Sequence, residues 1–239
     1  MIMQQSDDPR RVGGGDGSKQ PGDITPVTAS EVAVAKRLAV IDVGSNSVRL
    51  VVAELQQDGG FRILDEERES TRLAKDLDTS GRLDEASIRH SLAALRRFKK
   101  IASGLNVSHI RTIATSAVRE ADNVGDFRRE AQSETGLNVE IISSRQEAQL
   151  AFVSVENAFD ISEGNIAIAD IGGGSTEIVM ASGGHIQEIY NTRLGAVRLS
   201  DHCAGDYQRL VGEIDHELRK RLKKRPFIPR ILYGSGGTC

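Results

Sequence analysis

The sequence predicts an α/β protein made of two related halves. Predicted strands and helices alternate along most of its 239 residues, which is typical of folds that layer helices against a sheet. In addition, "LAVIDVGSNSVRLVVA" at residues 38–53 and "IAIADIGGGSTEIVMA" at residues 166–181 follow one plan. Each is an apolar strand that ends in an acidic residue, followed by a glycine turn and a second apolar strand. The pair therefore indicates a duplicated strand-turn-strand unit.

The two copies align across the turn as well as along the strands. Placing Asp42 on Asp170 also puts Gly44 on Gly172. A carboxylate beside the backbone N–H groups of a glycine turn is an unusual combination unless a cation joins it. For either copy alone, the alternative is an ordinary hairpin in which the Asp caps the next turn.

The first half is expected to begin after a disordered tail, because residues 1–35 are rich in Gly, Ser, Asp and Gln and have little to bury. We expect a helix over 85–103 that begins after Asp84 and stops at Gly104, since its apolar residues recur at helical spacing. The other expected elements are strands at 37–43, 47–56, 61–70, 109–115 and 138–142, a polar turn at 116–123, and helices at 124–135 and 145–159.

The second half repeats the hairpin plan and then adds a helix. We expect a strand-turn-strand hairpin within 166–181, a turn at Gly183 and Gly184 before a strand at 185–193, a helix near 206–222 and a strand at 230–234. The domains are expected at 36–160, including the helix between the halves, and at 161–239. The second domain is expected to be truncated, because a unit that matched the first half would need more helix and strand after Thr238.

Composition excludes several classes of protein. Hydrophobic residues make up 38% of the chain and charged residues 27%, which fits a soluble globular protein. A net charge of −3 argues against a general nucleic-acid binder, so an anionic substrate must be held by local charge. The two cysteines, Cys203 and Cys239, give neither a disulfide framework nor zinc-ligand spacing. No apolar run approaches the roughly 18 residues of a membrane span, and no signal peptide is visible, so we expect a cytoplasmic protein.

The glycine turns have the chemistry of phosphate-binding loops. Such loops bind phosphate through backbone N–H groups and hydroxyls. The first turn supplies Gly44, Ser45, Asn46 and Ser47, with Arg49 beyond it, and the second supplies Gly172, Gly173, Gly174, Ser175 and Thr176. Nearby carboxylates would repel phosphate directly, but Mg²⁺ takes oxygen ligands and commonly bridges carboxylates to phosphate. The candidate Mg²⁺ ligands are Asp42, Asp170 and Glu177.

Several further segments resemble one family in order and spacing. They are "IDVGSNSVRLVV", "IATSAVREADN", "VEIISSRQEAQLAF", "ADIGGGSTEIV", "RLGAVRLSD" and "YGSGGT". They are similar to the exopolyphosphatase and guanosine pentaphosphate phosphohydrolase (Ppx/GppA) family, which belongs to the superfamily of actin, the sugar kinases and the heat-shock chaperone ATPases. The resemblance implies two ribonuclease-H-like domains that face each other across a cleft, Mg²⁺ dependence, and hydrolysis of a terminal phosphoanhydride.

The resemblance also assigns roles to individual residues. Glu147 matches the family's catalytic glutamate, which acts as general base, and Arg119 matches an arginine that holds a phosphate oxygen. Gly236 lies in the "GSGGT" turn that completes the second ligand surface in the superfamily. On their residues alone, Glu147 could be a solvated helix glutamate and Arg119 could pair with Glu120.

One departure from the family pattern concerns the helix that carries Glu147, and the other is the truncation at "GSGGT". The family often has Glu before the catalytic position and Arg two residues after it, where this chain has Gln146 and Gln149. Arg145 is a candidate to compensate for the missing arginine.

The resemblance leaves three functions open. The leading one is a Mg²⁺-dependent hydrolase that releases terminal phosphate from inorganic polyphosphate, guanosine pentaphosphate or both. The alternatives are an ATP-dependent kinase of the same superfamily and a non-catalytic protein that binds polyphosphate or guanosine tetraphosphate. No nucleic acid or membrane partner is expected, and a homodimer is a possible assembly.

One basic segment lies outside these motifs. The run "RKRLKKR" at 219–225 is either a solvated helix end, where the helix dipole favours cations, or a guide for a long polyanion.

Overall fold

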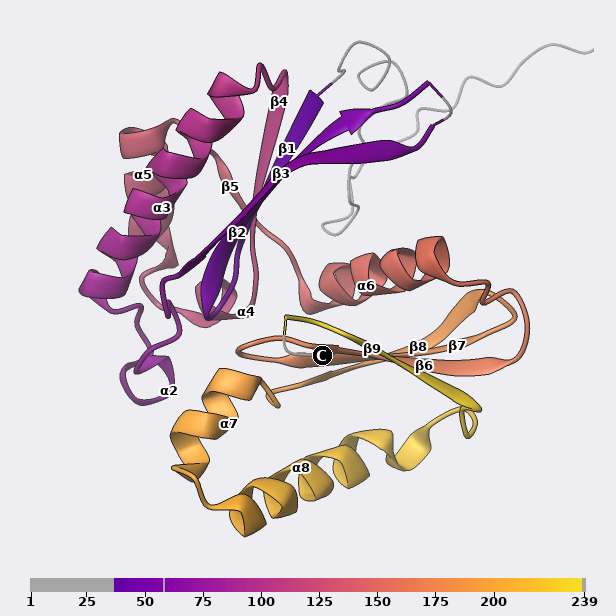
Figure 1. The fold of residues 1–239 in the computed structure, drawn as a ribbon. Helices are drawn as coiled ribbons and strands as arrows, with labels where there is room; N and C mark the ends of the chain where they lie inside the picture. The colour runs from indigo at the N-terminus through magenta and orange to yellow at the C-terminus, as the bar shows by residue number, and fades with distance from the viewer. Residues whose placement is uncertain (1–36, 58, 238–239) are drawn as a thin grey trace, which may run out of the picture.

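A computed structural model of the protein describes residues 37–57 and 59–237, and the predicted tail and Cys239 lie outside this described part. The described chain forms two α/β halves, each built on one sheet (Figure 1). None of the described helices is long and apolar enough to cross a bilayer.

The first sheet has five strands in the order β3-β2-β1-β4-β5. The hairpin strands are antiparallel, whereas β1, β4 and β5 run parallel. The bounds are β1 Arg37–Val43, β2 Ser47–Leu55, β3 Phe61–Ser70, β4 His109–Ala114 and β5 Val139–Ile141. All five strands were predicted from the sequence, to within one or two residues at their ends.

Two helices, α3 (Glu85–Gly104) and α5 (Val124–Thr135), cover one face of this sheet (Figure 1). The helix α3 begins where predicted, because the Asp84 carboxylate accepts a hydrogen bond from the Ser87 N–H at 2.9 Å. Its apolar stripe packs with alternate residues of β1 and β2 in one core that contains Ile41, Leu50, Ile88, Leu92, Leu95 and Phe98.

The prediction for the segment that follows β4 is partly wrong. The polar turn expected at 116–123 begins as a short helix, α4 (Ser116–Glu120), because its first three residues, Ser116, Ala117 and Val118, are buried. A second short helix, α2 (Leu77–Ser80), was not predicted. It is held by the buried side chain of Leu77 and ends at Gly81 in the left-handed conformation.

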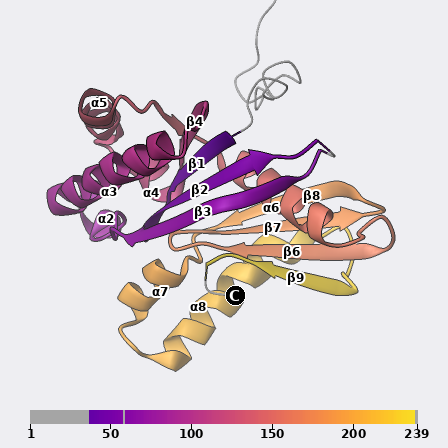
Figure 2. The ribbon, with the colours of Figure 1, turned by 45° about the horizontal axis from the view of Figure 1, so that its top comes forward.

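The second sheet repeats the first with one strand fewer among the described residues, in the order β8-β7-β6-β9 (Figure 2). Its strands are β6 Asn165–Ile171, β7 Thr176–Ser182, β8 His185–Thr192 and β9 Ile231–Ser235. The duplication extends to detail, since an irregularity in register follows Val52 in the first sheet and Met180, the aligned residue, in the second.

Helices lie on both faces of the second sheet. The helix α6 (Ser144–Ala158) packs on one face through Ala148, Ala151, Phe152 and Val155, and α8 (Tyr207–Arg221) lies across the other face (Figure 1). The helix α6 was predicted to belong to the first domain, but it shares its core with the second sheet. The helix α7 (Ala196–Cys203) was not predicted, and a 3₁₀ turn, Leu222–Lys224, follows α8.

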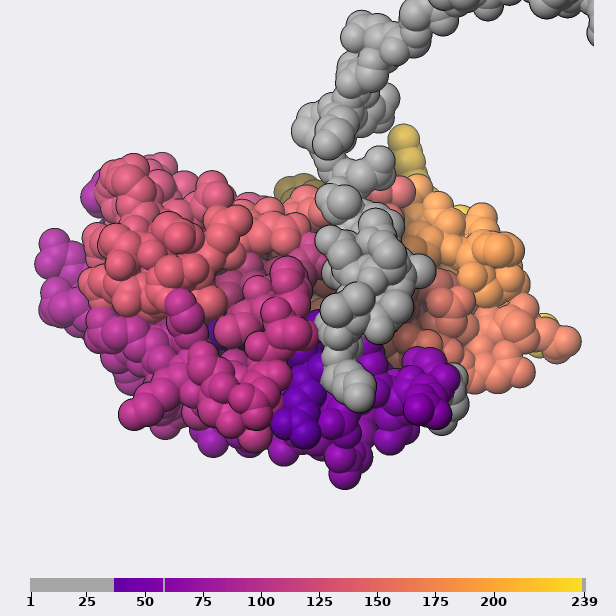
Figure 3. All heavy atoms as spheres, turned by 90° about the horizontal axis from the view of Figure 1, so that it is seen from above, coloured from indigo at the N-terminus to yellow at the C-terminus, as the bar shows by residue number. Residues whose placement is uncertain are grey.

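This arrangement brings four strand ends together. In the first sheet, Val43 at the end of β1 pairs with Ala114 at the end of β4. In the second sheet, Asp170 near the end of β6 pairs with Ser235 at the end of β9. The two halves form adjoining masses in the space-filling view, indigo to magenta on one side and orange on the other (Figure 3). Ligands of α/β proteins bind beyond the carboxyl ends of parallel strands, so the junction of the halves is where a site is expected.

Candidate active site

Both glycine turns have the same backbone geometry. The Gly44 N–H donates to the Ser47 carbonyl at 3.0 Å, and the Gly172 N–H donates to the Ser175 carbonyl at 2.9 Å. These equivalent hydrogen bonds close the turns that were aligned from sequence. We call residues 44–47 the first cradle and residues 172–175 the second cradle.

In each cradle, backbone carbonyl groups have hydrogen-bond partners in the protein, whereas several backbone N–H groups do not. In the first, the Asn46 carbonyl accepts hydrogen bonds from the N–H groups of Thr71 and Arg72. In the second, the carbonyls of Gly172 and Gly173 accept from the first turn of α7. Within the described part of the chain, the N–H groups of Ser45, Asn46, Gly173 and Gly174 have no protein acceptor. Unpaired N–H groups in successive turn residues suit the binding of an anion.

The two cradles are in contact. A Cβ atom on Gly174 would lie 2.5 Å from the hydroxyl oxygens of both Ser45 and Ser116, which is too close for any side chain. Around this contact lies a pocket of about 480 Å³. It is lined from the first half by Asp42, Gly44, Ser45, Asn46, Ser47, Arg49, Arg68, Thr115 and Ser116, and from the rest of the chain by Glu147, Asp170, Ile171, Gly172, Gly173, Gly174, Ser175, Ala196, Val197, Ser235, Gly236 and Gly237.

Glu147 enters this pocket from the first turn of α6. Its carboxylate accepts a hydrogen bond from Arg119 Nη1 at 3.1 Å, and the same nitrogen donates to the Ile142 carbonyl at 2.8 Å. The Glu147 side chain is only 16% exposed. Both alternatives raised by the sequence are therefore wrong: Glu147 is not a solvated helix residue, and Arg119 pairs with Glu147 rather than with Glu120.

The departure from the family pattern at Gln146 has a structural role. Its side-chain oxygen accepts from the Ser143 N–H at 2.8 Å, and the Ser143 hydroxyl accepts from the Gln146 N–H at 3.2 Å. This reciprocal pair is a capping box, in which Gln serves as well as Glu. The helix end that carries Glu147 is thus held by its cap and by Arg119. Arg145 is exposed, and no ion pair with the other described residues is found for it.

Four carboxyl groups interact around the pocket. Burial raises the pKa of Asp42 to about 6, of Glu147 to about 7 and of Glu177 to about 8. Burial also raises the pKa of Asp170. Arg119 opposes the rise at Glu147, whereas the negative charges of Asp42 and Asp170 add to it. Burial therefore disfavours the ionised form of these carboxyl groups when no cation is bound.

The carboxyl groups fit a hard cation by their chemistry. Asp42 Oδ1 and Glu177 Oε1 are buried and have no hydrogen-bond partner among the described residues. Such orphaned oxygens are suited to Mg²⁺, which commonly takes one or two carboxylates together with phosphate oxygens. No three acidic, His or Cys side chains in residues 37–57 and 59–237 are grouped closely enough to hold a metal by themselves. The three predicted Mg²⁺ ligands, Asp42, Asp170 and Glu177, therefore do not form such a group by themselves among the described residues.

Most of the predicted site residues meet in this pocket, and three lie just outside its lining. Arg119 lies behind Glu147 as its hydrogen-bond donor. Glu177 is 1% exposed and interacts with Glu147 and Asp170. The Thr176 hydroxyl donates to the Leu194 carbonyl and so faces away from the pocket. Arg49 reaches the rim, where Nη2 lies 2.7 Å from Glu66 Oε1.

Sequence reasoning missed four polar residues of the lining, which are Arg68, Thr115, Ser116 and Ser235. Arg68 lies opposite Arg49 in the β2–β3 ladder, and its Nε donates to the Ser47 hydroxyl at 3.1 Å. Residues paired in this way point to the same face, so the hairpin register was the signal that could have found Arg68. Ser116 begins α4, and its burial against the second cradle has no signal in the local sequence.

Comparison with known proteins identifies the relatives of this chain. The profile described as "Ppx/GppA phosphatase family" matches residues 50–238. The chain is 32% identical over 164 residues to Exopolyphosphatase 1 of Mycobacterium tuberculosis, covering 69% of this chain and 48% of that protein. It thus spans about half the length of the curated relatives that it matches.

Solved structures give the same result. The crystal structure of the Aquifex aeolicus member of the Ppx/GppA protein family has a TM-score of 0.70 and 32% identity, covering 85% of this chain and 67% of that chain. A crystal structure of an exopolyphosphatase from Cytophaga hutchinsonii has a TM-score of 0.77 and 27% identity, covering 84% of this chain and 67% of that chain. The predicted fold class, an α/β protein of two related domains with the fold of the Ppx/GppA family, is confirmed.

Proposed function

The chain belongs to the Ppx/GppA phosphatase family, and we therefore propose that it takes part in Mg²⁺-dependent hydrolysis of the terminal phosphoanhydride bond of a phosphate chain. Inorganic polyphosphate is the first candidate substrate, since relatives bear the name exopolyphosphatase. Guanosine pentaphosphate is the second candidate, because it also ends in a phosphoanhydride.

One observation carries the proposal: a buried carboxylate faces two phosphate cradles in a single pocket. Glu147 lines the same cavity as both glycine turns and is held there by Arg119 at 3.1 Å. Phosphoryl transfer depends mainly on positioning and charge neutralisation, together with a group that orients or deprotonates the attacking water. The pocket offers the protein groups for each of these tasks.

Binding would begin at the cradles. Their unpaired N–H groups at residues 45–46 and 173–174 can donate to phosphate oxygens, and Arg68 adds a positive charge at the pocket wall. Asp42 and Asp170 line the pocket and would hold Mg²⁺, with the buried Glu177 behind them. When bound, the ion would neutralise charge on the phosphate oxygens. The cradles would thereby fix the terminal phosphate in front of Glu147.

Glu147 is suited to the role of general base. Burial raises its pKa to about 7, so near neutral pH the group can both accept and release a proton. The Arg119 guanidinium orients the carboxylate and leaves its second oxygen for the water. In this role Glu147 takes the proton from the attacking water as the oxygen–phosphorus bond forms, and the shortened phosphate chain leaves.

The test is phosphate release from long-chain polyphosphate and from guanosine pentaphosphate, each with Mg²⁺ or excess EDTA. We expect metal-dependent release that Glu147→Gln abolishes. Glu156→Gln is the matched control, because Glu156 lies on the same helix but is exposed. Glu147→Gln should still bind inorganic tripolyphosphate, since the cradles are unchanged.

The possible results separate the candidate functions. Release that continues in Glu147→Gln would overturn the assigned base. No release by the unmodified chain, with tripolyphosphate still raising its melting temperature, would favour the non-catalytic binding protein. Release that requires a hydroxyl acceptor and a nucleotide would indicate the kinase.

A further inference from the structure

Arg198 belongs to the second half by its backbone and contacts the first half by its side chain. It lies in the first turn of α7, where its N–H donates to the Gly173 carbonyl of the second cradle at 3.2 Å. Its side chain is only 10% exposed. The guanidinium therefore points into the protein, away from the solvent.

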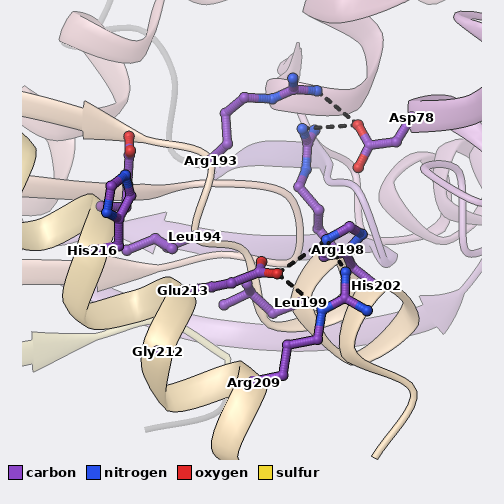
Figure 4. A pocket seen from close by; sticks show the side chains of 11 residues that line it. Asp78, Arg193, Leu194, Arg198, Leu199, His202, Arg209, Gly212, Glu213 and His216 are labelled. Atoms are coloured by element: carbon purple, nitrogen blue, oxygen red, sulfur yellow. Dashed lines mark hydrogen bonds and ion pairs between the residues drawn. The ribbon is translucent and has the colours of Figure 1, made fainter. Parts of the chain in front are cut away.

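The guanidinium bridges two carboxylates of the first half. Arg198 Nη2 donates to Glu120 Oε2 at 3.0 Å, and Nη1 lies 2.9 Å from Asp78 Oδ1. Glu120 is the last residue of α4, and Asp78 belongs to α2. Figure 4 shows Arg193 and Arg198 both directed at Asp78, although Arg193 is 66% exposed. The contact with Glu120 is a charged hydrogen bond, whereas the contact with Asp78 is an ion pair without hydrogen-bond geometry, so the guanidinium holds one carboxylate by direction and the other by charge.

Beyond Glu120, the contacts lead back to the phosphate site. The other oxygen of Glu120 accepts from the Ser116 hydroxyl at 3.2 Å, and Ser116 packs against Gly174 of the second cradle. Glu120 also follows Arg119, the donor to Glu147, on the same short helix. Arg198 thus joins the second cradle to the helix that supplies Ser116 and Arg119.

We propose that Arg198 is a positioning residue that fixes the separation of the two phosphate cradles by joining the Gly173 carbonyl to Glu120 and Asp78. It touches no reacting atom, and it does not line the phosphate pocket. Its catalytic meaning rests on the proposed function. Its structural role, a buried tie between the halves beside the exposed Arg193, which contacts the same two carboxylates, does not depend on hydrolysis.

The test compares Arg198→Gln with Arg209→Gln in this chain. Arg209 pairs with Glu213 on its own helix and lines the same side pocket as Arg198, so it controls for the loss of one arginine there (Figure 4). Without ligand, Arg198→Gln should speed amide hydrogen exchange severalfold in both cradles and in α4. Its affinity for inorganic tripolyphosphate with Mg²⁺ should fall roughly tenfold, within the usual range of coupling between sites. Arg209→Gln should match the unmodified chain in both measurements.

Two more variants test the route of the effect. Arg198→Lys keeps the positive charge but loses the planar guanidinium. Its amide exchange rates and its affinity for tripolyphosphate should therefore lie between those of Arg198→Gln and the unmodified chain. In a Glu120→Gln background, Arg198→Gln should weaken tripolyphosphate binding by less than tenfold, because one of the two contacts that it removes is already altered.

The outcomes are distinct from those of the hydrolysis assay. Unchanged exchange in Arg198→Gln, or losses of affinity that multiply in the double variant, would overturn the proposal. Absence of phosphate release by the unmodified chain would count against the proposed function alone, since the exchange measurement needs neither substrate nor turnover.

Discussion

Replacing Gly195 with alanine tests whether the second cradle is packed as the structure shows. Gly195 caps the N-terminus of α7 with φ −91° and ψ 142°, a conformation that any residue adopts. Its Cβ would lie 2.3 Å from the Gly174 carbonyl carbon and 2.4 Å from the Gly173 carbonyl oxygen. The change therefore introduces a steric clash with the second cradle without backbone strain.

The size of the effect follows from these contacts. Carbon atoms in contact prefer about 3.5–4.0 Å, so the cradle would have to move by roughly 1 Å or more. Backbone atoms cannot rotate away as a side chain does. Overpacking of this kind costs about 1–3 kcal/mol, which for a chain of this size lowers the melting temperature by roughly 2–12 °C. A displacement of 1 Å in a catalytic site can reduce the rate by about 100-fold.

The assay combines thermal unfolding, tripolyphosphate binding and phosphate release. Gly212→Ala is the control, because Gly212 lies in α8 and its Cβ would meet no atom within 4 Å. Alanine favours a helix, so Gly212→Ala should stabilise the protein by up to about 1 kcal/mol and leave binding unchanged. If Gly195→Ala melted and bound tripolyphosphate like the unmodified chain, the packing of α7 against the second cradle would be refuted.

Three further predictions follow from charge. In metal-free buffer the free energy of unfolding should fall from about pH 5 to about pH 8, because burial raises the folded-state pKa of Asp42 to about 6, of Glu147 to about 7 and of Glu177 to about 8. The folded protein then holds these protons more tightly than the unfolded chain, so their stabilising effect is lost as the pH rises through those values. Denaturant titrations should show this slope flattened in Glu177→Gln, and an equal slope in both proteins would contradict it. Arg68→Gln should weaken tripolyphosphate binding roughly tenfold, because the pocket loses a charged hydrogen-bond donor, whereas Arg62→Gln on the same strand should leave binding unchanged. Equal affinities of the two variants by calorimetry would show that Arg68 is not part of the site. Neutralising Lys220, Lys223 and Lys224, the exposed lysines of the basic run, should weaken binding of long polyphosphate in a salt-dependent way but leave tripolyphosphate binding unchanged. Unaltered affinity for the long chain would indicate that the run is only a solvated helix end.

The duplicated units could be predicted from the sequence because their information is local. An apolar strand, a glycine turn and a second apolar strand specify a hairpin within about 16 residues, and the turn residues specify the cradle. The alignment of Asp42 with Asp170 was enough to expect two equivalent turns, and both form the same hydrogen bond. The spacing of apolar residues and the composition of the turns were thus enough to predict the main parts of the site.

The remaining parts depend on contacts between distant segments. The first turn of α7 is held by the carbonyls of the second cradle, and α4 by burial of Ser116, Ala117 and Val118. Neither short segment shows a helical period of its own, so propensity did not reveal it. Glu120 could be paired only with neighbours in sequence, whereas its partners are Arg193 and Arg198, more than 70 residues away. Such pairings arise from the packing of the two halves and leave no local pattern.

The two cradles share a backbone but differ in charge, and this difference bears on their roles. In the first hairpin, Asp42 lies opposite Arg49; in the second, the equivalent Asp170 lies opposite Glu177. The first cradle therefore has a cation beside its carboxylate, and Arg49 opposes the rise that burial causes in the pKa of Asp42. The second has two carboxylates, so a phosphate approaching it meets repulsion unless a cation intervenes. The proposed Mg²⁺ is thus required chiefly by the second cradle. The two hairpins differ at one aligned position, Arg49 in the first and Glu177 in the second, and this difference explains why equivalent turns would serve different parts of a single reaction.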